Sequence, residues 1–322
     1  MAAFPHHFND SQLMRQNSGP SGMPAVHEEY AHGCQACVQS VVNTGLHYLV
    51  AVDGSPSADL ALMLCLMVRN KRDFVTIFHA YRDDQTGVPD KYKADTLRSR
   101  YEYDIAAAHV PSEHFHICWM AREGKSVSET IHNYIEFLKI KDDTKAPHFV
   151  VTGHTGRKMN KYVAPLSSNC NWFIRSLQLP VLVAKKELPG RSAPKTWMMA
   201  VDGTVHSNRA LDMILFLIKP KDSLELFYVY SDVMNRKEED YMKFIKAHYE
   251  NELAEEGPTN SSFNLIPQQI GVSLSHSVVN YVNEKSPHFL CLGPRASAYQ
   301  HLTPMTEYVL NNADCNLVVA LN

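Results

Sequence analysis

Two acidic turns with the same local sequence are the first places where this chain could do chemistry. Asp53 follows an apolar run in the sequence AVDGS, and Asp202 follows a similar run in AVDGT. A carboxylate at the end of a buried strand can accept hydrogen bonds from a ribose hydroxyl or an amine. Because an Asp-Gly pair also forms a strand-exit turn without any ligand, both interpretations stay open at this point.

A second polar segment has the composition of an anion site. It reads GHTGRKMNK and contains Gly153, Gly156 and the cation Arg157. Ser167 and Ser168 then begin a helical pattern, where backbone N–H groups and hydroxyls can hold a phosphate. Glycines, amides and cations in this order predict that the segment binds phosphate.

The acidic turns belong to an internal duplication. Residues 47–55 recur at 196–204 with an offset of 149 residues, whereas the final apolar runs, 181–184 and 317–320, align with an offset of 136. A decreasing offset indicates that the second copy lost residues between its strands. We therefore divide the chain into four parts: an extension expected to be mobile (1–45), repeat 1 (46–187), a linker (188–195) and repeat 2 (196–322).

Each repeat alternates short apolar runs with amphipathic stretches. Such runs are typical of strands covered on both faces, and the alternation indicates α/β folding with a doubly wound, parallel sheet. In repeat 1 we expect strands at 47–52, 74–80, 114–119, 147–152 and 181–184, and helices at 57–70, 90–108, 126–139 and 166–177.

A strand order of 3-2-1-4-5 would bring the two polar segments together. In that order the first and fourth strands are neighbours, so Asp53 and Gly153 would meet in one crevice beyond their carboxyl ends. Ser57 and Ser207 are expected to cap the helices that follow the two Asp-Gly turns.

Composition excludes several classes of protein. The formal net charge is −3, which argues against nucleic-acid binding through a basic surface. The sequence contains no run of eighteen apolar residues, so no membrane span is predicted. Seven cysteines suit a reducing cytoplasm better than a disulfide framework. A single CxxC, Cys34 and Cys37, favours reduced thiols over a zinc site, so we expect no metal site.

Taken in order, these features resemble the universal stress protein (UspA-like) family. The resemblance rests on the AVDGS and AVDGT strands, the Ala61-Leu62 and Ala210-Leu211 pairs, the Gly-x-x-Gly loop and the closing apolar strand. It implies a flavodoxin-like (adenine nucleotide α-hydrolase-like) fold used twice in tandem. It also implies that ATP, with Mg²⁺, binds through the strand-one Asp and a G-x2-G-x9-G-[S/T] loop. Pairing of the last strands would make the two repeats an internal pseudo-dimer.

The loop departs from the family pattern in both repeats. Leu166 stands at the third glycine of repeat 1, while repeat 2 has Ala296 at the second glycine and Thr303-Pro304 at the end. Repeat 1 is therefore the expected nucleotide site, formed by Asp53, Gly153, Gly156, Arg157, Ser167 and Ser168. The degenerate second site comprises Asp202, Gly293 and Arg295.

Three functions follow as hypotheses. The first is a non-catalytic binding or signalling module for ATP or another adenine nucleotide. The second is a scaffold without nucleotide that contacts protein partners, through residues 1–45 among others. The third is a weak ATPase, which is disfavoured because no set of nucleophile, base and acid stands out, so no catalytic residue is assigned.

Overall fold

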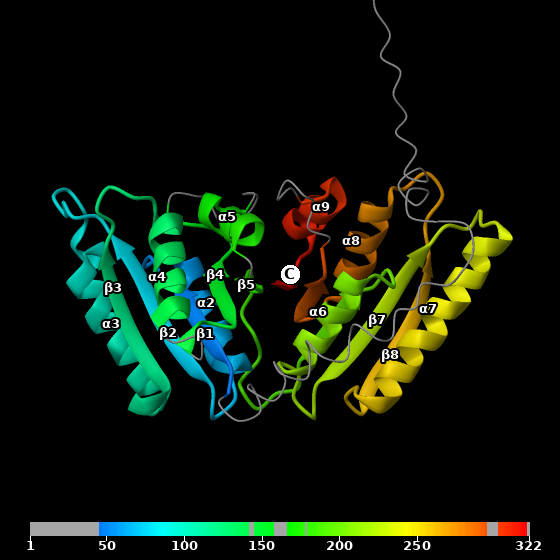
Figure 1. Cartoon of the computed structure of the whole chain (residues 1–322), viewed down its shortest axis with the longest axis horizontal. Helices are drawn as coiled ribbons and strands as arrows, with labels where there is room; N and C mark the ends of the chain where they lie inside the picture. Colours follow the sequence, from blue (N-terminus) through cyan, green and yellow to red (C-terminus); the bar gives the residue numbers. More distant parts are fainter. Residues whose placement is uncertain (1–44, 142–144, 158–165, 178, 295–301, 321–322) are drawn as a thin grey trace, which may run out of the picture. The chain divides into compact units, whose positions relative to one another are not determined.

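The computed structural model describes residues 45–141, 145–157, 166–177, 179–294 and 302–320 (Figure 1). The extension predicted at residues 1–45 lies outside the described residues, apart from Gly45. Repeat 1 contains five strands, β1 (His47–Ala51), β2 (Phe74–Tyr81), β3 (Phe115–Ala121), β4 (Phe149–Gly153) and β5 (Val181–Ala184). Its elements between strands are α2 (Pro56–Val68), η2 (Asp90–Tyr92), α3 (Ala94–Ala107), η3 (Ser112–His114), α4 (Val127–Lys141) and α5 (Ser168–Ser176).

Repeat 2 contains the same series of strands and α-helices. Its strands are β6 (Thr196–Ala200), β7 (Ser223–Tyr230), β8 (Asn260–Pro267), β9 (Phe289–Leu292) and β10 (Asn316–Val319). Its helices are α6 (Val205–Leu215), α7 (Arg236–Glu255), α8 (Leu274–Lys285) and α9 (Pro304–Asn312).

The strands form one continuous sheet in the order β3-β2-β1-β4-β5-β10-β9-β6-β7-β8. Read from its outer edge towards the middle, each half has the predicted order 3-2-1-4-5, and the strand pairs within each half are parallel. The halves join where β10 pairs with β5 in antiparallel register, with Val318 opposite Leu182. The two predicted sheets are thus the two halves of a ten-stranded sheet.

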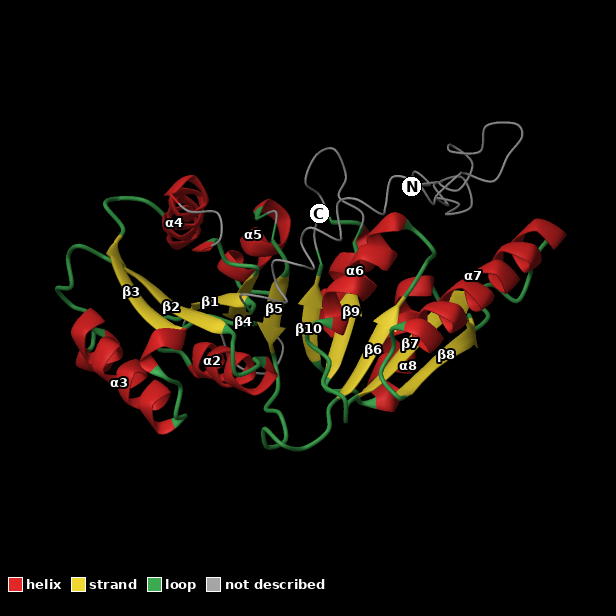
Figure 2. Cartoon of the chain, turned by 60° about the horizontal axis from the view of Figure 1, so that its bottom comes forward, coloured by secondary structure: helices red, strands yellow, loops and turns green. Residues whose placement is uncertain are grey.

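Helices cover both faces of this sheet, as the apolar strands require. Figure 2 shows α2 and α3 on one face of the first five strands, and α4 and α5 on the other. One apolar core runs across the junction between the repeats, and it includes Phe173 of α5 and Leu310 of α9. Packing between the repeats is therefore continuous with packing inside them.

The edge at the amino ends of the strands uses the same contacts in both repeats. The buried Asp73 carboxylate accepts hydrogen bonds from the Leu46 and Asn70 amides, at 2.9 and 2.6 Å. Its counterpart Asp222 accepts from the Lys195 and Lys219 amides, at 2.8 and 3.0 Å. In each repeat the aspartate links the residue before the first strand to the loop that leads into the second strand. The role of both aspartates is therefore structural.

The predicted helix caps are wrong by a few residues. Ser55 caps α2 and Thr204 caps α6, since their side chains accept from the Ala58 and Ser207 amides. An N-cap must sit immediately before the first helical residue, and both helices begin earlier than the sequence indicates. Ser57 instead accepts a hydrogen bond from the Thr155 amide at 3.2 Å, which holds the loop after β4.

Candidate nucleotide site of repeat 1

The candidate site lies at the carboxyl edge of the sheet, where β1 and β4 are neighbours. Asp53 follows β1 by two residues, and Gly153 is the last residue of β4. Parallel strands that end at one edge deliver the loops that follow them to a common crevice. The structure therefore brings together the two polar segments that are about 100 residues apart in sequence.

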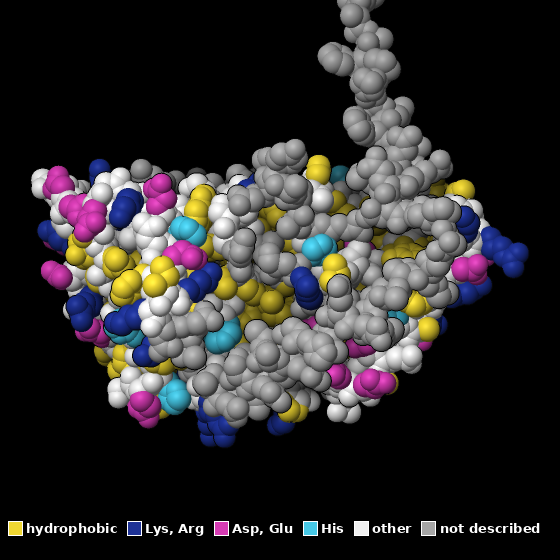
Figure 3. Space-filling model, viewed as in Figure 1, with side chains coloured by type: hydrophobic (Ala, Val, Ile, Leu, Met, Phe, Trp, Pro, Cys, Tyr) yellow, Lys and Arg dark blue, Asp and Glu magenta, His cyan; other side chains and the backbone are white. Residues whose placement is uncertain are grey.

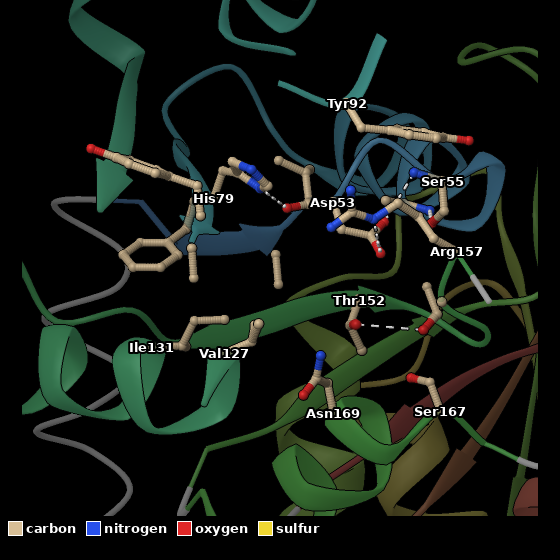
Figure 4. A pocket seen from close by; sticks show the side chains of 18 of the residues that line it. Asp53, Ser55, His79, Tyr92, Val127, Ile131, Thr152, Arg157, Ser167 and Asn169 are labelled. Atoms are coloured by element: carbon tan, nitrogen blue, oxygen red, sulfur yellow. Dashed lines mark hydrogen bonds and ion pairs between the residues drawn. The ribbon is translucent and has the colours of Figure 1, made fainter. Parts of the chain in front are cut away.

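The Asp53 carboxylate is oriented by its own turn and by a cation. Its Oδ1 accepts a hydrogen bond from the Ser55 amide at 2.9 Å, and its Oδ2 lies 3.6 Å from Nε of Arg157. The Arg157 guanidinium in turn lies 5.2 Å from the centre of the Tyr92 ring, close enough for a cation–π contact. Figure 4 shows Asp53, Ser55 and Arg157 grouped beneath Tyr92.

The two glycines of the loop have different roles. A Cβ on Gly153 would lie 2.5 Å from the backbone of Ser57, so this glycine allows β4 to approach α2. A Cβ on Gly156 would meet Asp53 Oδ2 at 3.9 Å as its nearest neighbour. Gly153 is thus needed for packing, as Gly293 is beside His206 in repeat 2, whereas the space next to Gly156 is open towards the carboxylate.

The start of α5 completes the crevice. The Ser167 side chain accepts from the Cys170 amide and caps the helix, while the Ser167 amide donates to the His154 carbonyl at 2.9 Å. The first turn of a helix presents N–H groups without intrahelical partners, and the helix dipole favours an anion there. Ser167 and Ser168 therefore place an anion-favouring helix end beside the loop of Gly156.

All six residues predicted for repeat 1 line one cavity of about 330 Å³, a volume suited to a small-molecule ligand. The cavity has a polar side with Arg157 and Ser167 and an apolar wall that includes Val127 and Ile131 of α4 (Figure 4). A ligand with an anionic group at one end and an apolar ring at the other matches this division.

Several residues of the lining were not expected from the sequence. Arg82 follows β2, Arg122 follows β3, and Tyr92 and Asn169 also line the cavity. The two arginines each stand one residue after an apolar strand, which is a signal that the sequence contains. Tyr92 could not be found this way, because its η2 turn reaches the site only through the tertiary fold.

One buried histidine also lines the cavity. His79 on β2 is held by a hydrogen bond of 2.7 Å between its Nδ1 and the Val52 carbonyl. Burial lowers the pKa of His79, and the bond to the carbonyl opposes that shift. The uncharged ring is thereby fixed as part of the wall behind Asp53.

The corresponding edge of repeat 2 differs in its chemistry. Asp202 Oδ1 accepts hydrogen bonds from the Thr204 amide, the Thr204 hydroxyl and the Ser207 hydroxyl, at 3.0, 2.6 and 2.6 Å. Ala58 occupies the position of Ser207 in repeat 1, so Asp53 lacks that hydroxyl partner. The Asp202 carboxylate therefore accepts more hydrogen bonds from its own turn and from the start of α6 than the Asp53 carboxylate accepts from the corresponding residues.

The cations at the strand ends are also replaced in repeat 2. Ser231 stands at the position of Arg82, and Gln268 stands at that of Arg122. The latter match is structural, because the Arg122 and Gln268 amides donate to Tyr81 and Tyr230 carbonyls, at 2.9 and 2.7 Å. Of the predicted second site, Asp202 and Gly293 are described, and Arg295 lies outside the described residues.

Surface charge, metal-ligating side chains and helix length bear on which other kinds of site the described residues could form. On the face shown in Figure 3, Lys and Arg side chains are interspersed with Asp and Glu, so the cations of the cavity are a local feature. Within the described residues, no three His, Cys, Asp or Glu side chains are grouped as a metal site would require. The helices of this part of the chain are all too short or too polar to cross a bilayer.

Fold and site together define a doubly wound α/β protein with an anion-favouring crevice at the carboxyl edge. The fold is shared with a universal stress protein from Archaeoglobus fulgidus DSM 4304, with a TM-score of 0.59 at 15% identity, covering 85% of this chain and 98% of that chain. A protein from Pseudomonas aeruginosa UCBPP-PA14 assigned to the universal stress proteins gives 0.57 at 15% identity, covering 85% and 92%.

A protein of unknown function from Pseudomonas aeruginosa PAO1 gives a TM-score of 0.56 at 14% identity, covering 85% of this chain and 91% of that chain. No protein-family model matches the sequence, and no curated protein matches it either. The chain therefore has the fold of the universal stress proteins, and the fold class predicted from the sequence is confirmed.

Proposed function

We propose that repeat 1 binds an adenine nucleotide, ATP with Mg²⁺, as a non-catalytic binding or signalling module. The observation that carries this proposal is the single cavity that brings Asp53, Gly156, Arg157 and the start of α5 together beside an apolar wall. Phosphates would lie at the polar end, where Arg157, glycine-loop amides and the helix terminus favour anions. The purine would lie along Val127 and Ile131, and Asp53 would accept from the ribose.

The cavity fits a bound nucleotide better than a hydrolytic centre. Asp53 is the one carboxylate among the described residues of the lining, and Arg157 and Ser55 already engage it. An ion-paired carboxylate is a poor general base, and Mg²⁺ commonly binds through one or two carboxylates together with substrate phosphates. Asp53 would therefore hold the ribose or the Mg²⁺–phosphate group rather than activate water.

Repeat 2 would act as the degenerate partner in an internal pseudo-dimer. The antiparallel pairing of β5 with β10 and the shared apolar core support this arrangement.

The five cysteines within the described residues are free thiols, which supports a reducing compartment such as the cytoplasm.

Isothermal titration of the chain with ATP and Mg²⁺ tests the proposal. We expect binding, and we expect Asp53→Ala to weaken it about 10- to 100-fold, the range for a hydrogen bond to a charged group. Asp83→Ala is the matched control, since Asp83 is an exposed carboxylate outside the cavity lining. Absence of heat at high micromolar protein would reject nucleotide binding.

A further inference from the structure

One backbone amide at the start of α5 is held by the other repeat. The Leu166 amide donates to Oδ1 of Asn311 on α9 at 3.1 Å. The Leu166 side chain is buried in the core that both repeats share. Leu166 immediately precedes Ser167, the cap of the helix that forms the anion end of the cavity.

Helix α9 is itself fixed against repeat 1. The Lys185 ammonium group, one residue beyond β5, donates to the Leu310 and Ala313 carbonyls, each at 2.8 Å. Cations that bind the last carbonyls of a helix stabilise its carboxyl end. Near the start of α9, Glu307 accepts from Arg175 of α5 at 3.1 Å. Both ends of α9 are therefore held by repeat 1, so Asn311 occupies a fixed position.

The contact runs in one direction only. Helices α5 and α9 align with an offset of 136, since Leu166 matches Leu302 and Asn311 matches Arg175 (302 − 166 and 311 − 175). Arginine has five donors and no acceptor, so Arg175 cannot accept from the Leu302 amide as Asn311 accepts from Leu166. Repeat 2 thus supplies a hydrogen-bond acceptor to repeat 1, and the side chain of Arg175 cannot make the equivalent bond to repeat 2.

We propose that Asn311 of repeat 2 is a positioning residue for the nucleotide site of repeat 1. Its carboxamide oxygen holds the Leu166 amide, so that the adjacent Ser167 and the first N–H groups of α5 face the cavity. This inference rests on the proposed function, because its ligand is the nucleotide proposed for repeat 1. It assigns the degenerate repeat a task that requires no ligand of its own.

Neighbouring asparagines on α9 provide a matched test. Asn311 and Asn312 each donate from Nδ2 to a carbonyl four residues earlier, at 2.9 and 2.8 Å. Asn311→Ala should weaken ATP·Mg²⁺ binding about tenfold, the effect of one ordinary hydrogen bond, while Asn312→Ala should stay within about twofold. Asn311→Asp keeps an acceptor oxygen, so it should restore most of the affinity.

Amide hydrogen exchange in the ligand-free protein gives a second readout. Exchange at Leu166 should be faster in Asn311→Ala than in the wild type or Asn312→Ala, and urea titration checks that each variant folds. Equal Leu166 exchange in all three proteins, or equal loss of affinity in both alanine variants, would overturn the inference. Wild-type binding with unchanged Asn311→Ala affinity would reject the inference alone, whereas a wild type that binds no ATP would reject the proposed function as well.

Discussion

The two repeats use the same aspartate contacts at the amino edge of the sheet, whereas several side chains differ between them at the carboxyl edge. At the amino edge, Asp73 and Asp222 accept from equivalent pairs of amides. At the carboxyl edge, Arg82 and Arg122 of repeat 1 become Ser231 and Gln268. Buried residues that make the same contacts in both repeats, such as Asp73 and Asp222, therefore indicate what the fold requires, whereas cations present in repeat 1 alone indicate where a ligand site could persist.

Gly153 at the end of β4 and Gly293 directly after β9 give the largest expected effect. A Cβ at Gly153 would lie 2.5 Å from the backbone of Ser57 in α2, and a Cβ at Gly293 would lie 2.4 Å from that of His206 in α6. Gly153→Ala and Gly293→Ala should therefore each lower the free energy of unfolding by about 3 kcal/mol, measured by urea denaturation. Gly156→Ala is the control and should change it by less than about 0.5 kcal/mol. A large loss of stability in only one of the first two variants would show that the repeats are not structurally equivalent at this position.

The buried aspartates of the amino edge should rank next. Asp73→Asn and Asp222→Asn each replace one of the two accepting oxygens by an amide group, which leaves a backbone N–H unpaired. We expect a loss of about 2–3 kcal/mol in each repeat, and unchanged ATP affinity in both variants. Nucleotide binding that falls with Asp73→Asn while the fold survives would show that this edge is not purely structural.

Acid should act on repeat 1 through His154, which aligns with Pro294 of repeat 2. Burial, and to a smaller extent Lys185, lowers the pKa of His154 to about 4, and its buried Nε2 has no hydrogen-bond partner among the described residues. The unfolded chain binds this proton near pH 6.5, so stability is full above that pH and declines as the pH falls towards 4.

His154→Gln should remove this part of the pH dependence. With allowance for partial solvent exposure, the decline between pH 7 and pH 4 should be smaller by about 2 kcal/mol than in the wild type. Urea midpoints at both pH values measure it, and Pro294→Gln serves as the control in repeat 2. The same decline in the wild type and in His154→Gln would show that His154 is not the group responsible.

The helix caps of α5 and α9 give the smallest expected change. Ser167→Ala and Thr303→Ala each remove a side-chain acceptor for an amide in the first helical turn. Each should cost about 1 kcal/mol in thermal or urea unfolding, the usual value of an N-cap. Only Ser167→Ala should also weaken ATP binding, and an equal loss of affinity in both variants would contradict the assignment of the site to repeat 1.

The sequence predicted the fold well because its signals are local. Apolar runs placed all five strands of repeat 1, and the decreasing repeat offset anticipated two copies of one topology. Helix caps were misplaced at Ser57 and Ser207, since the exact start of a helix depends on side-chain geometry. Asn311 was missed because its role arises only when the two repeats pack, and no spacing in the sequence encodes that contact.

The most direct test of the central claim is the number of nucleotides bound per chain, measured by native mass spectrometry with ATP and Mg²⁺. We predict one nucleotide in the wild type and one in Asp202→Ala, whereas Asp53→Ala should need about 10- to 100-fold more ATP to reach the same occupancy. Two nucleotides per chain, or a loss that follows Asp202→Ala and spares Asp53→Ala, would contradict this claim.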